Sequence, residues 1–329
     1  MTPMRILALG ALALLLATPA GAAGPPPGCE GKDLSETADL AAARERRADD
    51  LVNADGLLWR IEKGDLAPSY LFGTIHSTDD GALALARRAA ERIEGAKTAA
   101  TELGPLDPVQ KADMAAKLFA RGLDQGRDTF ADLPQEERAG VATLAAAKGV
   151  GGPLAHHMKL WLLALLTATP ACESKRQAAG LEEVDEYLAG AARKLRIEVV
   201  GLETVDEQID VISALRREVV APLLAAQARD PELDDDVYAT MLRLYRQSRP
   251  AEILAVVDAV GGLSPDERAA EEEFTRVLLR GRNAVMAERA APLLAAGGAF
   301  VAVGALHLAG RDGLIERFRA MGYTVVKEW

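Results

Sequence analysis

The distribution of strand-like segments constrains the fold of this chain more than any other feature of its sequence. Long intervals with helical periodicity separate six short apolar stretches, so only distant segments can combine into one sheet. We therefore expect an α/β protein: a single domain with a mixed β-sheet assembled from N-terminal, central and C-terminal strands, and with a large helical middle. The stretches that we expect as strands are residues 57–62, 69–76, 97–103, 197–203, 299–307 and 323–327.

A glycine-rich stretch at residues 148–153 leaves a second organisation open, in which the chain divides there into two domains. Strands on both sides of the helical interval favour one domain instead. The first two strands are joined by the loop 63–68, which contains Gly and Pro and predicts a hairpin. Inside the helical interval, Thr204 and Glu207 have the spacing of a capping box and predict a helix start.

The N-terminus has the pattern of an export signal. Arg5 precedes an uninterrupted run of about 12 small apolar residues, and Ala20-Gly21-Ala22 fits the small-residue cleavage pattern. The run is shorter than the roughly 20 residues needed to span a bilayer, which favours a cleavable signal over a membrane anchor. We expect a periplasmic or secreted protein that is not an integral membrane protein. Its expected parts are a signal peptide at 1–22, a leader and first helix at 23–50, and the domain itself at 51–329.

The charge balance excludes one large class of partners. The chain has 38 Lys and Arg residues against 49 Asp and Glu residues, and its formal net charge is −11. A nucleic-acid-binding protein needs a clustered basic surface, whereas the basic residues here are scattered along the chain. We therefore expect neither a nucleic acid nor an anionic lipid surface as a partner.

The two cysteines, Cys29 and Cys172, are too few for a disulfide-rich scaffold or a cysteine-based zinc site. In an oxidising compartment they can form one bridge, which would close a long loop and restrict the unfolded chain. The alternative is two unrelated thiols. We favour the bridge, because the predicted export places both cysteines in such a compartment.

Two of the four histidines occupy matching positions in distant parts of the chain. His76 lies three residues after Gly73, His307 lies three residues after Gly304, and each closes an apolar strand. A glycine at that place lets another backbone or a ligand approach closely. The carboxyl ends of strands are also where ligands bind in α/β sheets. The other two histidines are adjacent and open an apolar helical segment, where packing or capping accounts for them.

Acidic residues close two further strands at the same relative place, Glu102 on the third and Glu203 on the fourth. If these strand ends are neighbours, two imidazoles and one or two carboxylates meet. Such a set commonly binds a divalent metal ion, here zinc, manganese or cobalt, which can activate water. Without a metal ion the same groups are suited to general acid–base chemistry. The structural alternative is a pair of hydrogen-bonded histidines with helix-capping or solvated acids.

The chain resembles the TraB/GumN family over roughly residues 50 to 329. That family is similar to the Tiki proteins, which are regarded as metal-dependent proteases that use paired Gly-x-x-His motifs and a glutamate. The segments that carry the resemblance are 56–62, 69–76, 201–208 with Glu203 and Gln208, Arg282-Asn283, 300–310 with His307, and 313–325.

The resemblance implies a role for each candidate residue. His76, His307 and Glu102 would be metal ligands, with Glu102 as ligand or general base. Arg282 would stabilise developing negative charge. By the same resemblance, Glu203 and Asn283 would bind substrate.

We therefore expect an exported, peptidase-like metal-dependent hydrolase that acts on a peptide or cell-envelope substrate. One residue departs from the family pattern, because Leu306 stands where many relatives have glycine directly before the second histidine. A leucine there fills space beside the expected site. The rival interpretation is a non-catalytic periplasmic binding protein that uses the same pocket, and metal content distinguishes the two.

Overall fold

The computed structural model describes residues 26–37, 39–124, 126–260 and 264–329. The predicted signal peptide lies outside these residues. Within the described ranges, no helix is both long and apolar enough to cross a lipid bilayer. The predicted leader is an irregular segment from Pro26 onward, and the predicted first helix covers Leu40–Arg46.

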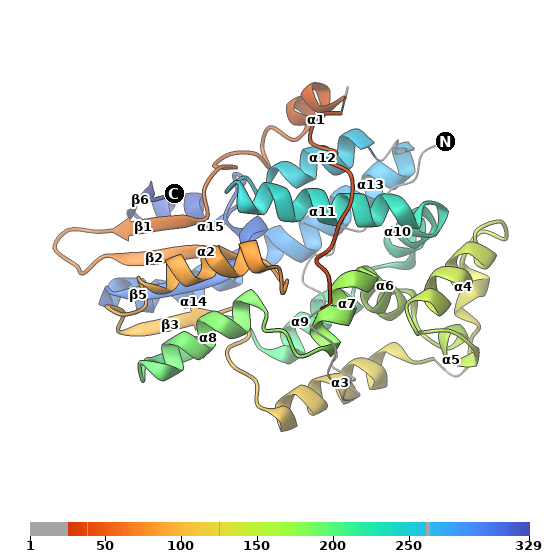
Figure 1. Cartoon of the computed structure of the whole chain (residues 1–329), viewed down its shortest axis with the longest axis horizontal. Helices are drawn as coiled ribbons and strands as arrows, with labels where there is room; N and C mark the ends of the chain where they lie inside the picture. Colours follow the sequence, from red (N-terminus) through yellow and green to blue (C-terminus); the bar gives the residue numbers. More distant parts are fainter. Residues whose placement is uncertain (1–25, 38, 125, 261–263) are drawn as a thin grey trace.

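The structure contains all the predicted strands, namely β1 (Leu58–Glu62), β2 (Ser69–Thr74), β3 (Thr98–Thr101), β4 (Glu198–Gly201), β5 (Ala299–Gly304) and β6 (Thr324–Lys327). They form one mixed sheet in the order β4-β3-β5-β2-β1-β6 (Figure 1). The four strands β4, β3, β5 and β2 run parallel to one another. β1 pairs antiparallel with β2, as the predicted hairpin, and also with β6.

The order of the strands confirms the α/β class and the assembly of the sheet from distant segments. β5 is close to the C-terminus, yet it lies between β2 and β3 from the N-terminal part of the chain. β3 therefore pairs on both edges with strands that come after residues 148–153. One sheet therefore contains strands from both sides of that stretch, as expected for a single domain.

Helices fill the rest of the described chain. The helix that follows β4 begins at the predicted capping box, in which Thr204 and Glu207 bond each other's backbone N–H groups. The helices are α1 (Leu40–Arg46), α2 (Asp80–Ala90), α3 (Pro108–Gly122), α4 (Arg138–Ala147), α5 (Pro153–His156), α6 (Leu160–Ala168), α7 (Ala171–Ala178), α8 (Val184–Lys194), α9 (Val205–Ser213), α10 (Arg217–Arg229), α11 (Pro231–Arg246), α12 (Glu252–Val260), α13 (Pro265–Thr275), α14 (Gly281–Ala296) and α15 (Leu314–Ala320). Shorter turns are the 3-10 segments η1 (Thr129–Asp132) and η3 (Ala305–His307), and the π-helical segment η2 (Arg276–Arg280).

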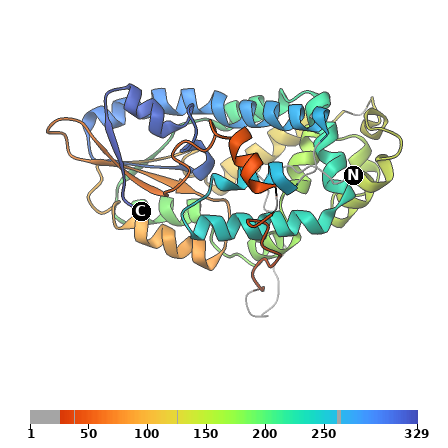
Figure 2. The ribbon, with the colours of Figure 1, turned by 90° about the horizontal axis from the view of Figure 1, so that it is seen from above.

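The sheet is covered on both faces. Helices α14 and α15 bury apolar side chains such as Met286 and Phe318 against one face. Helices α2 and α8 bury side chains such as Leu83 and Leu188 against the other. Figure 2 shows this layering, with blue α14 and α15 on one side of the strands and orange α2 on the opposite side. Because both faces are buried, β5 is entirely apolar, and the polar Ser69 and Thr74 of β2 lie at the two ends of that strand.

The other end of the molecule is helical. Helices α3, α4, α6, α10 and α13 share a second apolar core that includes Trp161 and Leu224, and they lie away from the sheet in Figure 1. The carboxyl ends of the parallel strands face the region between the sheet and these helices. This placement is the one at which open α/β sheets form their ligand sites.

The predicted strands end too late in the sequence. β2 ends at Thr74 and β5 at Gly304, two and three residues before the histidines that were expected to close them. After β5 the chain turns into η3, whose Ala305 lies against Gly73, where an added Cβ would come within 2.9 Å of Ala305. The glycine of the first motif therefore admits the backbone of the second, as the sequence predicted for a close approach.

Cys29 and Cys172 form the expected disulfide, with their Cα atoms 5.3 Å apart. The bridge connects the irregular leader to the start of α7 across 143 residues of sequence. The leader is also held by hydrogen bonds from Arg176 to the carbonyl of Pro26 and from the backbone N–H of Lys32 to Asp236. The N-terminal segment is thus fixed to α7 and α11.

Candidate functional site

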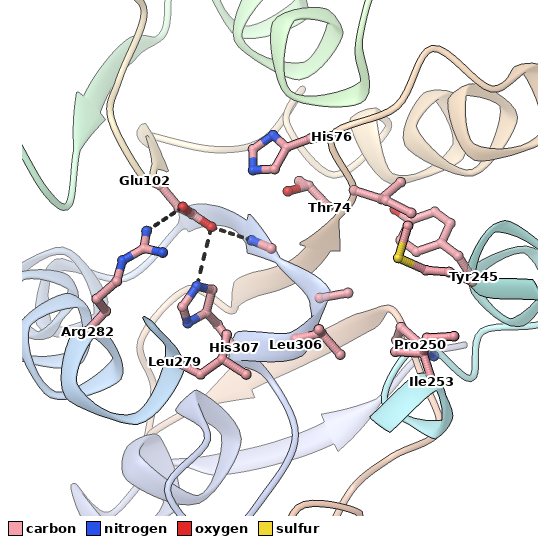
Figure 3. A pocket seen from close by; sticks show the side chains of 14 residues that line it. Thr74, His76, Glu102, Tyr245, Pro250, Ile253, Leu279, Arg282, Leu306 and His307 are labelled. Carbon is pink, nitrogen blue, oxygen red and sulfur yellow. Dashed lines mark hydrogen bonds and ion pairs between the residues drawn. The ribbon is translucent and has the colours of Figure 1, made fainter. Parts of the chain in front are cut away.

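Glu102 lies at the centre of the predicted residues, directly after β3 (Figure 3). Its Oε1 accepts a hydrogen bond from the backbone N–H of Gly304 at 2.7 Å. Its Oε2 accepts one from Nη2 of Arg282 at 2.6 Å. Nε2 of His307 lies 3.7 Å from Oε1. One carboxylate therefore joins the ends of two parallel strands to helix α14.

Glu102 is ionised despite its burial. Burial alone would raise the pKa of Glu102, but the Arg282 guanidinium outweighs it, assisted by the charge of His76 and by the N–H of Gly304. Together they hold the pKa of this carboxyl well below its usual range. The centre of the site therefore carries a fixed negative charge at neutral pH.

His307 is buried, and Asn283 fixes the orientation of its ring. Nδ1 of His307 lies 2.6 Å from Oδ1 of Asn283, whose Nδ2 donates to the carbonyl of Asp312 at 3.0 Å. Because that oxygen can only accept, we assign the ring proton to Nδ1. Burial, and then the charge of Arg282, lower the pKa of His307 to about 3. The neutral ring thus presents the lone pair of Nε2 to Glu102.

His76 lies on the other side of Glu102 in Figure 3 and has an acidic partner. Its Nδ1 is 3.2 Å from Oδ2 of Asp185, and Oδ1 of Asp185 accepts a hydrogen bond from Thr74 at 2.8 Å. Burial favours the neutral ring, but Asp185, and then Glu102 and Glu183, outweigh it and raise the pKa of His76 to about 10. His76 is therefore a cation at neutral pH in the metal-free protein.

Arg282 binds both acidic residues of the cluster. Its Nε donates to Oε1 of Glu203 at 2.9 Å, and its Nη2 donates to Glu203 as well as to Glu102. Gln208 donates to the same Glu203 carboxylate at 3.1 Å. Burial disfavours the charge of Arg282, yet the two carboxylates raise its pKa further above its usual value. The guanidinium is therefore held in one position by paired hydrogen bonds.

Glu203 and Asn283 lie behind this cluster: neither lines the two cavities that Glu102 and Arg282 line, although Asn283 lines a third cavity beside Leu306. Both side chains are buried, and both contact candidate residues: Glu203 contacts Arg282, and Asn283 contacts His307. Their contact with substrate, implied by the family resemblance, stays a prediction. In the structure, Glu203 orients Arg282 and Asn283 orients His307.

The loop that follows His76 is held by helix α7. Glu173 accepts hydrogen bonds from the hydroxyl of Ser77 at 3.1 Å and from the backbone N–H of Thr78 at 2.8 Å. Arg176 donates to the hydroxyl and to the carbonyl of Thr78 at 2.9 and 2.8 Å. Both Glu173 and Arg176 are buried, and α7 is the helix that carries the disulfide. The position of His76 thus depends on a helix that is tied to the leader.

Two cavities adjoin the cluster. The smaller has a volume of about 60 Å³ and lies between the strand ends, α11, α12 and η2. The larger is a groove of about 450 Å³ between α3, α8 and α9. His76, Glu102 and Arg282 line both. The cluster is therefore accessible from both cavities.

The donor set suits a divalent metal ion in type, because it offers two imidazoles and a carboxylate. Each histidine also has an oxygen on Nδ1, which is how proteins commonly orient an imidazole that binds a metal through Nε2. Among the residues that the structure describes, however, no three His, Cys, Asp or Glu side chains are grouped so that they could hold a metal ion together.

No sequence pattern indicated Asp185 or Glu173, and none gave Gln208 a role. Asp185 is the second residue of α8, where an acid is expected simply from the helix dipole. The π-helical turn η2 directly before Arg282 was equally hidden, although such turns are frequent at functional sites. One signal was available: the spacing of Gln208 from Glu203 places it on the first turn of α9, beside the acid.

Comparison with known proteins gives one match. The model of the TraB/PrgY/gumN family matches residues 57–327, which is nearly the whole chain and agrees with the resemblance seen in the sequence. No curated protein and no solved structure matches the chain.

Proposed function

Because the chain belongs to the TraB/PrgY/gumN family, we propose that it is an exported metal-dependent hydrolase that cleaves a peptide or a related amide. The observation that carries the proposal is the matched orientation of two imidazoles. Nδ1 of His307 is hydrogen-bonded to Oδ1 of Asn283 at 2.6 Å, and Nδ1 of His76 lies at ion-pair distance, 3.2 Å, from Oδ2 of Asp185. This arrangement leaves the Nε2 atoms for a ligand beside Glu102.

His76, His307 and Glu102 would hold the ion. When bound, a divalent metal lowers the pKa of its water and polarises a carbonyl group. The chain's own residues would do the rest. Glu102, ionised and beside the imidazoles, is positioned to bind the ion or to accept a proton. Arg282, fixed by two carboxylates, brings positive charge to the edge of both cavities, where it would favour developing negative charge.

Export is supported by the disulfide. The Cys29–Cys172 bridge requires an oxidising compartment to persist, and the periplasm is such a compartment. The pattern of the first 22 residues, an apolar run followed by a small-residue cleavage site, supports the same location.

Metal content tests the proposal. The purified protein, incubated with zinc, manganese or cobalt and desalted, should retain close to one ion per chain, measured by elemental analysis. His76→Ala and His307→Ala should each lose it. His156→Ala is the matched control, because His156 pairs with Asp128 at 2.9 Å on α5, away from the cluster. A wild-type protein that stays metal-free with all three ions would overturn the proposal.

Activity is a separate measurement. A metal-loaded protein should cleave members of a broad peptide library, and the two alanine variants should not. If the ion binds but every peptide stays intact, the protein is better described as a binding protein that uses the same pocket.

A further inference from the structure

The small cavity has one polar end and one apolar end. Glu102, Arg282 and His307 lie at the polar end, and Figure 3 shows Leu306, Pro250 and Ile253 at the other. The remaining apolar lining comes from Ile75, Met241, Leu279 and the ring of Tyr245.

The apolar end offers little to a polar ligand. The hydroxyl of Tyr245 already donates to the carbonyl of Gly73 at 2.7 Å, so only its ring faces the cavity. A polar or charged group pushed into this end would lose its hydrogen bonds to water and gain none in return. An aliphatic group, in contrast, is favoured there in proportion to the surface that it buries.

The size of the cavity narrows the occupant further. A buried water needs roughly 10–15 Å³ of such space, and this cavity has about 60 Å³. It therefore accommodates about four to six heavy atoms, which is enough for a valine or leucine side chain and fewer than a phenylalanine side chain contains. The groove of about 450 Å³ on the other side of Glu102 has room for several residues of an extended peptide.

We propose that the small cavity is a side-chain pocket for a small aliphatic residue of a peptide whose backbone lies in the groove. The inference rests on the proposed function, and it names the substrate class: a peptide with valine or leucine next to the bond that is cleaved. His76, Glu102 and Arg282 line both cavities, so a side chain in the pocket places the neighbouring backbone beside the cluster.

Leu306 sets the size limit. It lies in η3 directly before His307, and its side chain packs towards the α12 core while it lines the cavity. Shortening it to alanine enlarges the pocket at the apolar end without removing a hydrogen bond of the cluster. Leu306 is therefore a specificity-determining residue, and Leu306→Ala should admit larger side chains.

Binding is tested first, without any need for catalysis. The metal-free full chain, labelled at its Ile and Leu methyl groups, is titrated with N-acetyl-valinamide and with N-acetyl-phenylalaninamide. The valine probe should shift the methyl signals of Ile253 and Leu279, and the phenylalanine probe should not. In Leu306→Ala the phenylalanine probe should bind at least about 10-fold more tightly, as expected when a pocket gains space. Leu154→Ala, which shortens an exposed leucine on α5, should behave as wild type.

The second arm profiles cleavage sites in a peptide library with the metal-loaded protein. Wild type should favour valine or leucine over phenylalanine at one position beside the cut by about 10-fold or more, and Leu306→Ala should reduce that ratio by a similar factor. If the library stays uncut but the valine probe shifts the methyl signals, the proposed hydrolase activity is overturned and the proposed side-chain pocket stands. The proposed pocket would be overturned, whatever the library shows, if the valine probe did not shift the methyl signals or if wild type bound both probes equally.

Discussion

The two Gly-x-x-His motifs are alike in sequence and opposite in surroundings. The His307 side chain is 4% exposed and is held by a neutral amide, whereas the His76 side chain is 31% exposed and is held by a carboxylate. The pKa of His307 falls to about 3, and that of His76 rises to about 10. The motif therefore determines where a histidine stands, and the surroundings determine its charge: Asp185 outweighs burial at His76, whereas burial and the charge of Arg282 keep His307 neutral.

The difference has a chemical meaning for the proposed site. His307 offers a lone pair as it stands, whereas His76 must first lose a proton before it can bind a metal ion. Metal binding should therefore release a proton near neutral pH.

The largest effect should follow from removing Arg282, which binds both buried carboxylates of the cluster. Arg282→Met leaves Glu102 and Glu203 buried without their guanidinium, and breaking a buried pair in this way costs about 3–5 kcal/mol. Urea unfolding measures the change. Arg289→Met, on the same helix but with both partners exposed, should cost about 1 kcal/mol or less. Equal losses in the two variants would contradict the buried network.

Removing the disulfide should affect one side more than the other. The double change Cys29→Ser and Cys172→Ser should lower the free energy of unfolding by about 2–4 kcal/mol, because the bridge closes a long loop. Amide exchange should speed up most at Thr78, which α7 holds beside His76. If the amide of Leu308, beside His307, accelerates as much as that of Thr78, the bridge does not act selectively on the His76 side.

Exchanging the two partners should exchange the two titrations. In the metal-free protein, Asp185→Asn should lower the pKa of His76, because burial is then opposed only by the charges of Glu102 and Glu183. Asn283→Asp should raise the pKa of His307 by supplying the missing carboxylate. Imidazole signals in NMR titrations report both shifts. Ring pKa values that stay in place after the exchange would show that other charges set them.

The same pair predicts the shape of the pH–stability curve. Between about pH 6.5 and 10 the folded His76 holds a proton that the unfolded chain does not, so its contribution to stability is complete below about 6.5 and is lost as pH rises. His307 acts at the acid end: its contribution is complete above about 6.5 and is lost as pH falls towards 3. Asp185→Asn should flatten only the alkaline decline, which thermal unfolding at several pH values would measure.

The smallest effect should come from Thr74→Val, a change of similar volume that removes the hydrogen bond to Asp185. We expect a loss of about 1 kcal/mol in unfolding free energy. The NMR signals of His76 should move, and those of His307 should stay in place. A matching shift at His307 would mean that the two sides are not independent.

The sequence predicted the positions of the strands, because a buried strand has a local apolar pattern. It also predicted that the strand ends converge, because the carboxyl ends of parallel strands lie at the same edge of a sheet. It placed the strand ends too late, since the turn after Gly304 arises from a contact with Gly73 that no local pattern contains. Asp185 and Glu173 were not predicted as site residues for the same reason. Both are ordinary helix acids in sequence, and only tertiary packing brings them to His76 and its loop.

The place of β5 in the sheet also has a consequence for how the chain is made. While the ribosome or an export channel still holds the last thirty or so residues, β2 and β3 have no strand between them, and each presents unpaired backbone groups. The chain up to residue 298 can therefore reach secondary structure but not the complete sheet, and it is prone to pair with other chains during that interval. A truncated product that stops before residue 299 should aggregate, because it lacks the central strand of the sheet.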